Sequence, residues 1–238
     1  MRKVKEVRTS RVLVVYNVQP PLYLSQQRGR RLCDALVEEF PELLGSPLIA
    51  EDQFVTLLRA PSVGRAPEPV CHIANDSVNV TLSNPSEADL EQLGSLLRRV
   101  YDLVRDIYHV QRVLRAGRVH NKEYVLAEGE EDARAIVREC LTRLTAEQAT
   151  DVQLQFSRRD GPYNVNLSVF PVPTSGSKAD PEPPPHDLIV TGSDVNNWDV
   201  SGDVPWDKVE VILTRGAQHA NVEVPQFLRD QLHVDAQS

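Results

Sequence analysis

The sequence predicts an α/β protein of the α+β kind, built from two tandem β-α-β-β-β-α sandwich halves with antiparallel or mixed sheets. Short apolar runs of strand length recur along the chain, and amphipathic helical stretches separate them. The 238 residues suffice for one large domain or two small ones, and 41% hydrophobic with 25% charged residues is an ordinary globular balance. We expect an N-terminal half over residues 1–121, with a long second helix, and a C-terminal half over residues 122–238.

The N-terminal half opens with a strand. Residues 10–18 hold a near-continuous apolar run rich in β-branched residues, which is typical of a central strand, and Pro20 and Pro21 end it. Ser25 is a suitable N-cap for a helix that runs through Phe40. Turn-forming residues separate three further strand-like segments: residues 54–59, 70–74 and 78–82.

A long helix is predicted after these strands. Asn84 is the expected cap, Pro85 the first helical residue, and Glu87 the residue that completes a capping box. Apolar residues then alternate spacings of three and four, which places them on one stripe: Leu90, Leu93, Leu97, Val100, Val104 and Ile107. The stripe either packs on the protein's own sheet or, because the spacing is also a heptad, crosses a dimer interface.

The C-terminal half repeats the pattern after Gly117. The expected elements are a strand over residues 123–127, a helix over residues 130–144 with Ala133, Ile136, Val137, Cys140 and Leu144 on one face, and strands over residues 152–157 and 165–170 joined by a hairpin turn at Asp160-Gly161. Residues 171–186 hold six of the 17 prolines, a composition that predicts a mobile loop.

The last part of the chain resumes regular structure. Residues 188–191 are expected to form a strand, and residues 209–213 either a strand or the start of a helix. Pro225 opens a terminal helix, whose inward residues are predicted to be Phe227, Leu228 and Leu232.

Charge is unevenly spread along the chain. The net charge is -8, yet residues 1–31 hold eight Lys or Arg against Glu6 alone. A basic end on an acidic body could bind nucleic acid, an acidic peptide or another subunit, so a homodimer or a heterodimer with a related chain is expected. The simpler interpretation is that these arginines are solvated and pair with nearby carboxylates. An aromatic content of 5% disfavours nucleic acid, because single-strand binding uses stacked rings.

Motifs for catalysis and cofactor binding are lacking. HExxH, GxSxG, a Walker loop and GxGxxG do not occur, so we expect no catalytic residue, no metal and no cofactor. Cys71 and His72 are adjacent in a predicted strand and should point to opposite faces, which prevents a thiolate–imidazole pair. Three Cys without a CxxC pair indicate a cytoplasmic protein, and no apolar run approaches the roughly 20 residues of a membrane span.

Two segments contain candidate binding residues. Asp194, Asp199, Asp203 and Asp207 surround both tryptophans; these carboxylates could hold a hard cation, although turn chemistry explains them better. Trp198 and Trp206 either pack in the core or anchor a bound partner.

The second segment is rich in arginine. Residues 115–121 read Arg-Ala-Gly-Arg-Val-His-Asn and follow the long helix. Gly117 suits a helix end, where arginines oppose the helix dipole. Alternatively, Arg115 and Arg118 offer forked donors to a carboxylate of a bound peptide or of another subunit.

This Arg-x-Gly-Arg-x-x-Asn segment after a long helix, together with the opening proline-ended strand, resembles a sporadically distributed bacterial family. Its members are proteins of similar length and mostly unknown function, in which such a segment joins two α/β halves. The family includes the non-catalytic peptide-binding proteins of crocagin biosynthesis, a ribosomally made and modified peptide natural product. At His120 the family favours an aromatic residue, so the two patterns differ there.

The resemblance implies a peptide-binding accessory protein that presents a ribosomal precursor peptide to tailoring enzymes. Its peptide-binding residues would be Arg115, Arg118, Asn121, Trp198 and Trp206. A hydrolase without recognisable motifs that acts on a similar peptide, and a nucleic-acid-binding protein that uses the basic N-terminus, are the alternatives. A short strand with a free edge could also accept an extended peptide by strand addition.

Overall fold

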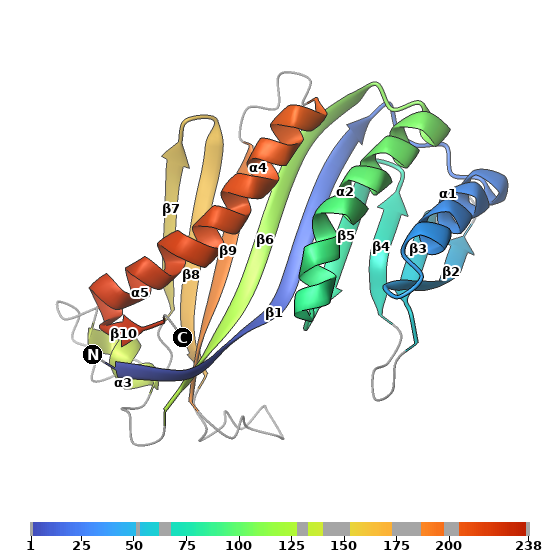
Figure 1. Cartoon of the computed structure of the whole chain (residues 1–238). Helices are drawn as coiled ribbons and strands as arrows, with labels where there is room; N and C mark the ends of the chain where they lie inside the picture. The colour runs from blue at the N-terminus through green and yellow to red at the C-terminus, as the bar shows by residue number, and fades with distance from the viewer. Residues whose placement is uncertain are drawn as a thin grey trace. The chain divides into compact units, whose positions relative to one another are not determined.

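The computed structural model describes residues 2–50, 53–61, 68–127, 133–139, 153–172, 187–197 and 205–236. The fold is mixed α+β with a large, mostly antiparallel sheet (Figure 1). The helices are α1 (Gln26–Glu39), α2 (Glu87–Tyr108), α3 (Ala133–Glu139), α4 (Trp206–Gln218), a π-helical segment (His219–Glu223) and α5 (Val224–Leu232). The strands are β1 (Arg2–Gln19), β2 (Leu44–Ala50), β3 (Phe54–Arg59), β4 (Pro69–Ala74), β5 (Ser77–Ser83), β6 (Arg112–Leu126), β7 (Leu154–Asp160), β8 (Tyr163–Val172), β9 (Leu188–Asn197) and β10 (Val234–Asp235).

Two compact units interleave along the chain. Unit 1 comprises residues 1–11, 119–195 and 214–238, and unit 2 comprises residues 12–118 and 196–213. The strand order is β2-β3-β4-β5-β1-β6-β9-β8-β7, with β10 pairing in parallel to β1. The N-terminal strand therefore contributes to both units, whereas the sequence suggested consecutive halves over residues 1–121 and 122–238.

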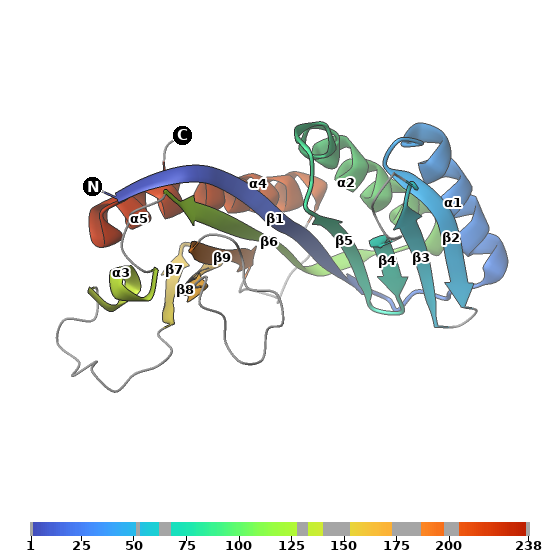
Figure 2. The same ribbon diagram turned by 90° about the horizontal axis from the view of Figure 1, so that it is seen from below.

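In unit 2, helices α1 and α2 lie on one face of the sheet. Figure 2 shows α1 and α2 on the same side of β2, β3, β4 and β5. Strand β5 alternates as a half-covered strand should: Val78, Val80 and Leu82 are buried, and the residues between them are partly exposed. Strands β3, β4 and β5 and the helix from Gln26 confirm the sequence predictions, including the Ser25 cap, whose hydroxyl accepts from the Arg28 N–H.

The apolar stripe of α2 is buried within the chain. From Leu93 to Ile107 its members are at most 5% exposed, and Leu90 is partly buried. Intramolecular packing was the first of the two predictions for this stripe, and it is confirmed. Because the stripe is buried inside the chain, it cannot form a heptad interface with a second chain, and it no longer supports the expected dimer.

Helix α2 begins two residues later than predicted. Ser86, not Asn84, is the N-cap, and its hydroxyl accepts from the Asp89 N–H at 3.2 Å. The Ser86 N–H in turn donates to the Asp89 carboxylate at 2.7 Å, so Asp89 and not Glu87 completes the capping box. Asn84 instead adopts a positive φ of 42° in the turn before the helix.

The capping box makes a testable difference between neighbouring residues. We expect Ser86→Ala to lower the free energy of unfolding by about 1 kcal/mol, because it leaves a helical N–H without its acceptor. Glu87→Ala should cost about 0.5 kcal/mol or less, because Glu87 contributes only its charge near the helix N-terminus. Urea unfolding of the two variants measures both values. Equal losses would contradict the capping box described above.

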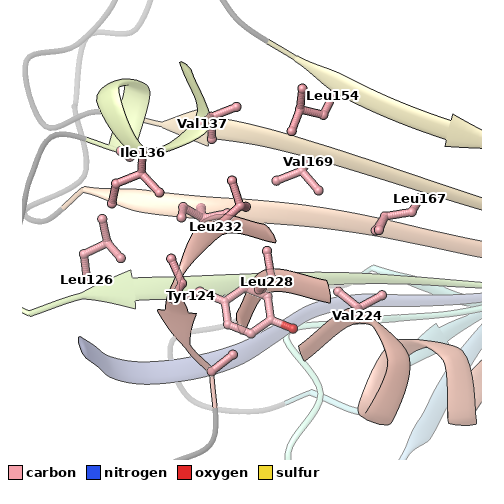
Figure 3. Close-up of a cluster of buried hydrophobic side chains, with 14 residues drawn as sticks. Tyr124, Leu126, Ile136, Val137, Leu154, Leu167, Val169, Val224, Leu228 and Leu232 are labelled. Atoms are coloured by element: carbon pink, nitrogen blue, oxygen red, sulfur yellow. The ribbon is translucent and has the colours of Figure 1, made fainter. Parts of the chain in front are cut away.

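Unit 1 has its own hydrophobic core, shown in Figure 3. It gathers side chains from β6, α3, β7, β8, β9 and α5, among them Tyr124, Ile136, Leu167 and Leu228. Strands β7 and β8 form an antiparallel hairpin in which Asp160 pairs with Tyr163, so the two turn residues are Gly161 and Pro162 rather than Asp160 and Gly161. Gly161 has a φ of +57°, the left-handed conformation that a tight hairpin turn uses.

Several expectations on the second half of the chain are resolved only in part. Residues 209–213 are helical, within α4, and Pro225 lies in the first turn of α5. Ala133, Ile136 and Val137 are buried on α3 as predicted, whereas Cys140 and Leu144 lie outside the described residues. Of the expected loop over residues 171–186, Pro171 and Val172 belong to β8, and residues 173–186 also lie outside.

Candidate functional site

The arginine segment lies in a strand and not at a helix end. Helix α2 already ends at His109, which takes the left-handed conformation at φ 57°, and residues 115–121 belong to β6. Arg115 and Arg118 are three residues apart in a strand, so their side chains leave opposite faces. Arg115 is exposed and Arg118 partly buried. The predicted pair of forked donors is therefore not assembled.

Arg118 is held inside unit 2. Its guanidinium Nη1 donates to the Leu213 carbonyl oxygen at 3.4 Å, which ties β6 to α4. Burial disfavours the charged form of Arg118 and lowers its pKa to about 10. The nearby Tyr16 partly offsets this lowering. This environment favours a structural contribution of Arg118 over direct contact with a ligand.

The remaining predicted residues differ in their placement. Asn121 is partly buried in unit 1, where its backbone oxygen accepts from the Ser10 hydroxyl at 3.3 Å. Trp198 lies outside the described residues, as do Asp199 and Asp203. Among the described members of the predicted set, Trp206 alone lies in an aromatic cluster.

Trp206 is the first residue of α4 and contacts the polar side of α2. Its ring centroid lies 4.9 Å from that of Tyr101, and the Arg98 Cζ lies 5.1 Å from the Trp206 ring centroid. Tyr101 in turn meets Tyr16 edge to face at 6.3 Å. We define the Trp206 surface as Arg98, Tyr101, Arg105 and Trp206. Tryptophan, tyrosine and arginine are the residue types enriched at binding hot spots.

A small apolar pocket adjoins this surface through Tyr101 and Arg105. We call it the valine pocket; its lining is Tyr16, Val18, Val78, Tyr101, Val104, Arg105, Val110 and Val113, and its empty volume is about 240 Å³ including the open mouth. The Tyr16 hydroxyl is buried and has no hydrogen-bond partner among the described residues. An unsatisfied buried hydroxyl is costly, and burial raises the pKa of Tyr16.

The charges at the Trp206 surface are nearly balanced. Arg98 pairs with Asp102 at 3.0 Å, and Arg105 lies 3.9 Å from Asp106. Both arginine side chains are more than half exposed, so these pairs are weak and the aromatic rings dominate the surface. The arrangement can bury an apolar or aromatic group and offers guanidinium donors at its rim.

Sequence reasoning missed Arg98, Tyr101 and Arg105. A signal for them exists, because the spacings of three and four place all three on one face of the predicted helix. Their contact with Trp206, more than 100 residues later in the chain, is a tertiary feature that no local pattern predicts.

Unit 1 holds a buried serine–histidine pair, which the sequence analysis also missed. The Ser193 hydroxyl lies 2.6 Å from His219 Nδ1, and His219 Nε2 lies 4.0 Å from the Glu223 carboxylate. Ser193 is 1% exposed, so a substrate cannot reach its hydroxyl in this structure. The pair therefore packs β9 onto the π-helical segment and does not form an accessible nucleophile.

Ion pairs surround this histidine. Arg215 bridges Asp160 and Glu223, at 2.6 and 2.5 Å, and Arg158 also reaches Glu223, at 2.6 Å. Burial opposes ionisation of Glu223, but the hydrogen bond and charge of Arg215 outweigh it and hold its pKa below the usual value. Burial lowers the pKa of His219, while the Glu223 carboxylate works in the opposite direction.

The histidine predicts a pH dependence of stability. An unfolded chain binds a proton near pH 6.5, whereas folded His219 resists protonation, so unfolding takes up a proton as the pH falls below that value. We expect the free energy of unfolding to drop between pH 7.5 and 5.5, by no more than about 1.4 kcal/mol per pH unit for this one group. His219→Gln should reduce that slope in urea titrations; an unchanged slope would contradict the assignment.

The described cysteines and the remaining described titratable groups show no reactive arrangement. Cys71 is buried, which raises the pKa of its thiol to about 12, and His72 is partly exposed and bonded to the Thr56 hydroxyl at 2.8 Å. The predicted separation of Cys71 and His72 is confirmed. In the described part of the chain, no three His, Cys, Asp or Glu side chains are grouped as metal ligands, and no described helix combines the length and apolarity of a membrane span.

The fold places the chain in the class of mixed α+β proteins. Comparison with known proteins takes this no further, because no protein-family model and no curated protein matches the chain. The resemblance of residues 115–121 to the bacterial peptide-binding family stays a prediction. The described chain does pass from unit 2 to unit 1 between Arg118 and Val119, within that segment.

Proposed function

We propose that the protein is a non-enzymatic peptide-binding protein, and that the Trp206 surface with its valine pocket is the binding site. The observation that carries the proposal is the cluster of Trp206, Tyr101 and Arg98 beside a small apolar pocket. The rings would cover an apolar side chain of the peptide, and the pocket beside them has room for no more than a methyl-sized group.

Ser193, which is hydrogen bonded to His219, is buried, and this supports binding without turnover. The one specific observation that favours the alternative, a hydrolase, is the Ser193–His219 hydrogen bond, and the burial of Ser193 weakens it. Catalysis there would need a movement of β9 or of the π-helical segment. A peptide that is bound and released unchanged is the expected behaviour.

The other parts of the proposal rest on the resemblance and on composition. The implied role is to present a ribosomal precursor peptide to tailoring enzymes, as a homodimer or together with a related chain. A cytoplasmic location fits Cys33 and Cys71, which are buried and free. Nucleic acid is a weaker partner, since Arg2 donates to the Leu232 carbonyl oxygen and Arg8 pairs with Glu6.

A selection experiment tests the proposal. A phage-displayed library of random decapeptides is selected on the wild-type protein and counter-selected on Trp206→Ala. Sequences rich in aromatic and aliphatic residues should be enriched by the wild type alone. Incubation of an enriched peptide with the protein, followed by mass spectrometry, should return the peptide with unchanged mass.

Two results would count against this function. Enrichment of the same sequences on Trp206→Ala would show that peptides bind elsewhere. A cleaved or modified peptide, lost in Ser193→Ala, would establish the hydrolase instead.

A further inference from the structure

We propose that an extended acidic segment of another polypeptide binds unit 1 by adding a strand to the outer edge of β7. This site is separate from the Trp206 surface, which belongs to unit 2, and the inference does not depend on the function proposed above. Strand addition uses main-chain hydrogen bonds for affinity and alternate side chains for selectivity.

Strand β7 is an edge strand by two criteria. It is the last strand in the order of the described sheet and pairs with β8 alone. Residues 155–159 are all exposed, on both faces of the strand, and Phe156 is 45% exposed. Edge strands present unpaired backbone groups that can pair with another chain.

The opposite edge of the sheet is less suited to strand addition. Strand β2 contains Pro47, which has no N–H to donate, and its pairing with β3 shifts register between Leu44 and Pro47. Proline and irregular register are devices that protect an edge from pairing. β7 has regular register along its seven residues and contains no proline.

The hairpin register identifies the backbone groups that face outward. Asp160 and Tyr163 flank the two-residue turn, and this closing pair of a tight hairpin is hydrogen bonded. Bonded and non-bonded pairs alternate along an antiparallel ladder. The N–H and C=O groups of Gln155, Ser157 and Arg159 therefore point away from β8, in the correct direction to meet an added strand.

Side chains indicate what the added strand should carry. Phe156 packs on Phe227, with ring centroids 5.0 Å apart, and leaves part of its ring open to an apolar residue. Near the hairpin, Arg158 and Arg215 both form ion pairs with Glu223, and Arg215 also pairs with Asp160. Arg158 and Arg159 are both exposed on this edge strand, so their positive charge favours an acidic segment over a neutral or basic one.

The same charges argue against a second copy of this chain. Two β7 strands side by side would bring Arg158 and Arg159 of both copies into one two-stranded ribbon, where like charges repel. A foreign strand can avoid this with an apolar residue opposite Phe156 and acidic residues two and three positions further along. That spacing follows from the positions of Phe156, Arg158 and Arg159 in β7.

Synthetic peptides test this geometry without knowledge of the natural partner. The probes are fluorescein-labelled Thr-Val-Thr-Phe-Thr-Glu-Glu-Thr and its reversed sequence, which cover both strand directions. The control probes have lysine in place of both glutamates. Fluorescence anisotropy with the full-length protein should show one acidic probe binding at least tenfold more tightly than its lysine control.

The matched protein variants separate backbone pairing from side-chain contact. Ser157→Pro removes an outward N–H and spares the ladder to β8, so we expect at least a tenfold loss of affinity. Ser157→Ala keeps the N–H and should change affinity less than twofold. Should Ser157→Pro fail to fold, as judged by circular dichroism, probes N-methylated at alternate residues provide the test, because methylation of the amides that face β7 alone should abolish binding.

Three results would overturn the proposal. They are equal affinity for the acidic and lysine probes, equal affinity of Ser157→Pro and Ser157→Ala, and light scattering that shows a dimer which Ser157→Pro converts to a monomer. The last result would assign the edge to a second copy. The same measurements on Trp206→Ala remove any binding of the probes at the Trp206 surface, so the failure of either proposed site is distinguishable from failure of the other.

Discussion

Leu228→Ala is expected to lower the free energy of unfolding by about 3 kcal/mol. Leu228 is fully buried in the core of unit 1, where it lies among side chains of β6, α3, β8 and β9. Truncation removes apolar contacts and leaves a cavity that neighbouring strands cannot fill without moving. Urea unfolding followed by circular dichroism measures the loss.

Val222→Ala is the matched control for this prediction. Val222 lies six residues earlier in the adjoining π-helical segment and is 57% exposed. Its truncation should change the free energy of unfolding by about 0.5 kcal/mol or less, as for other surface substitutions. A loss at Val222 that matches the loss at Leu228 would mean that the core is placed wrongly.

The strands that alternate or carry long apolar runs were predictable from the sequence. Phe54–Arg59 was predicted with its observed bounds, and β5 shows the expected alternation of buried and exposed residues. β2 was not predicted, because Gly45 and Pro47 interrupt its pattern. β2 is a strand because it pairs with β3, and local strand propensity does not predict that tertiary pairing.

The end of α2 shows why the arginine segment was misplaced. Gly117 and three arginines resemble a helix C-terminus, but the helix stops at His109, a non-glycine residue in the left-handed conformation. Histidine gives no stop signal in a sequence. Because the helix ends eight positions before Gly117, the segment is a strand and not a helix end, and Arg115 and Arg118 point to opposite faces.

Of the Trp206 surface, only Trp206 itself was predictable from the sequence. Trp206 stood out because both tryptophans of the chain fall within nine positions. Its neighbours Tyr101 and Arg98 come from α2, and the interleaved units, which bring residues 196–213 together with residues 12–118, follow from packing over long sequence separation. The Ser193–His219 bond joins two elements in the same way.

Trp206→Ala should weaken binding of a peptide selected on the wild-type protein by roughly thirtyfold, or about 2 kcal/mol. The indole is the largest ring of the Trp206 surface, and its loss also removes the partner of Tyr101 and the face on which Arg98 rests. Calorimetry measures the affinity, with circular dichroism to confirm the fold. Trp206→Phe should recover part of the lost affinity, because it restores a smaller ring at the same position.

Two further variants decide whether this effect belongs to the site. Val211→Ala lies on the same helix at a residue that is 54% exposed, and it should leave affinity unchanged. Tyr16→Phe removes a buried hydroxyl that lacks a partner among the described residues, so stability should be kept or improved while affinity stays the same. If Trp206→Ala binds as the wild type does, the aromatic cluster serves the packing of α4 on α2 and the peptide site lies elsewhere.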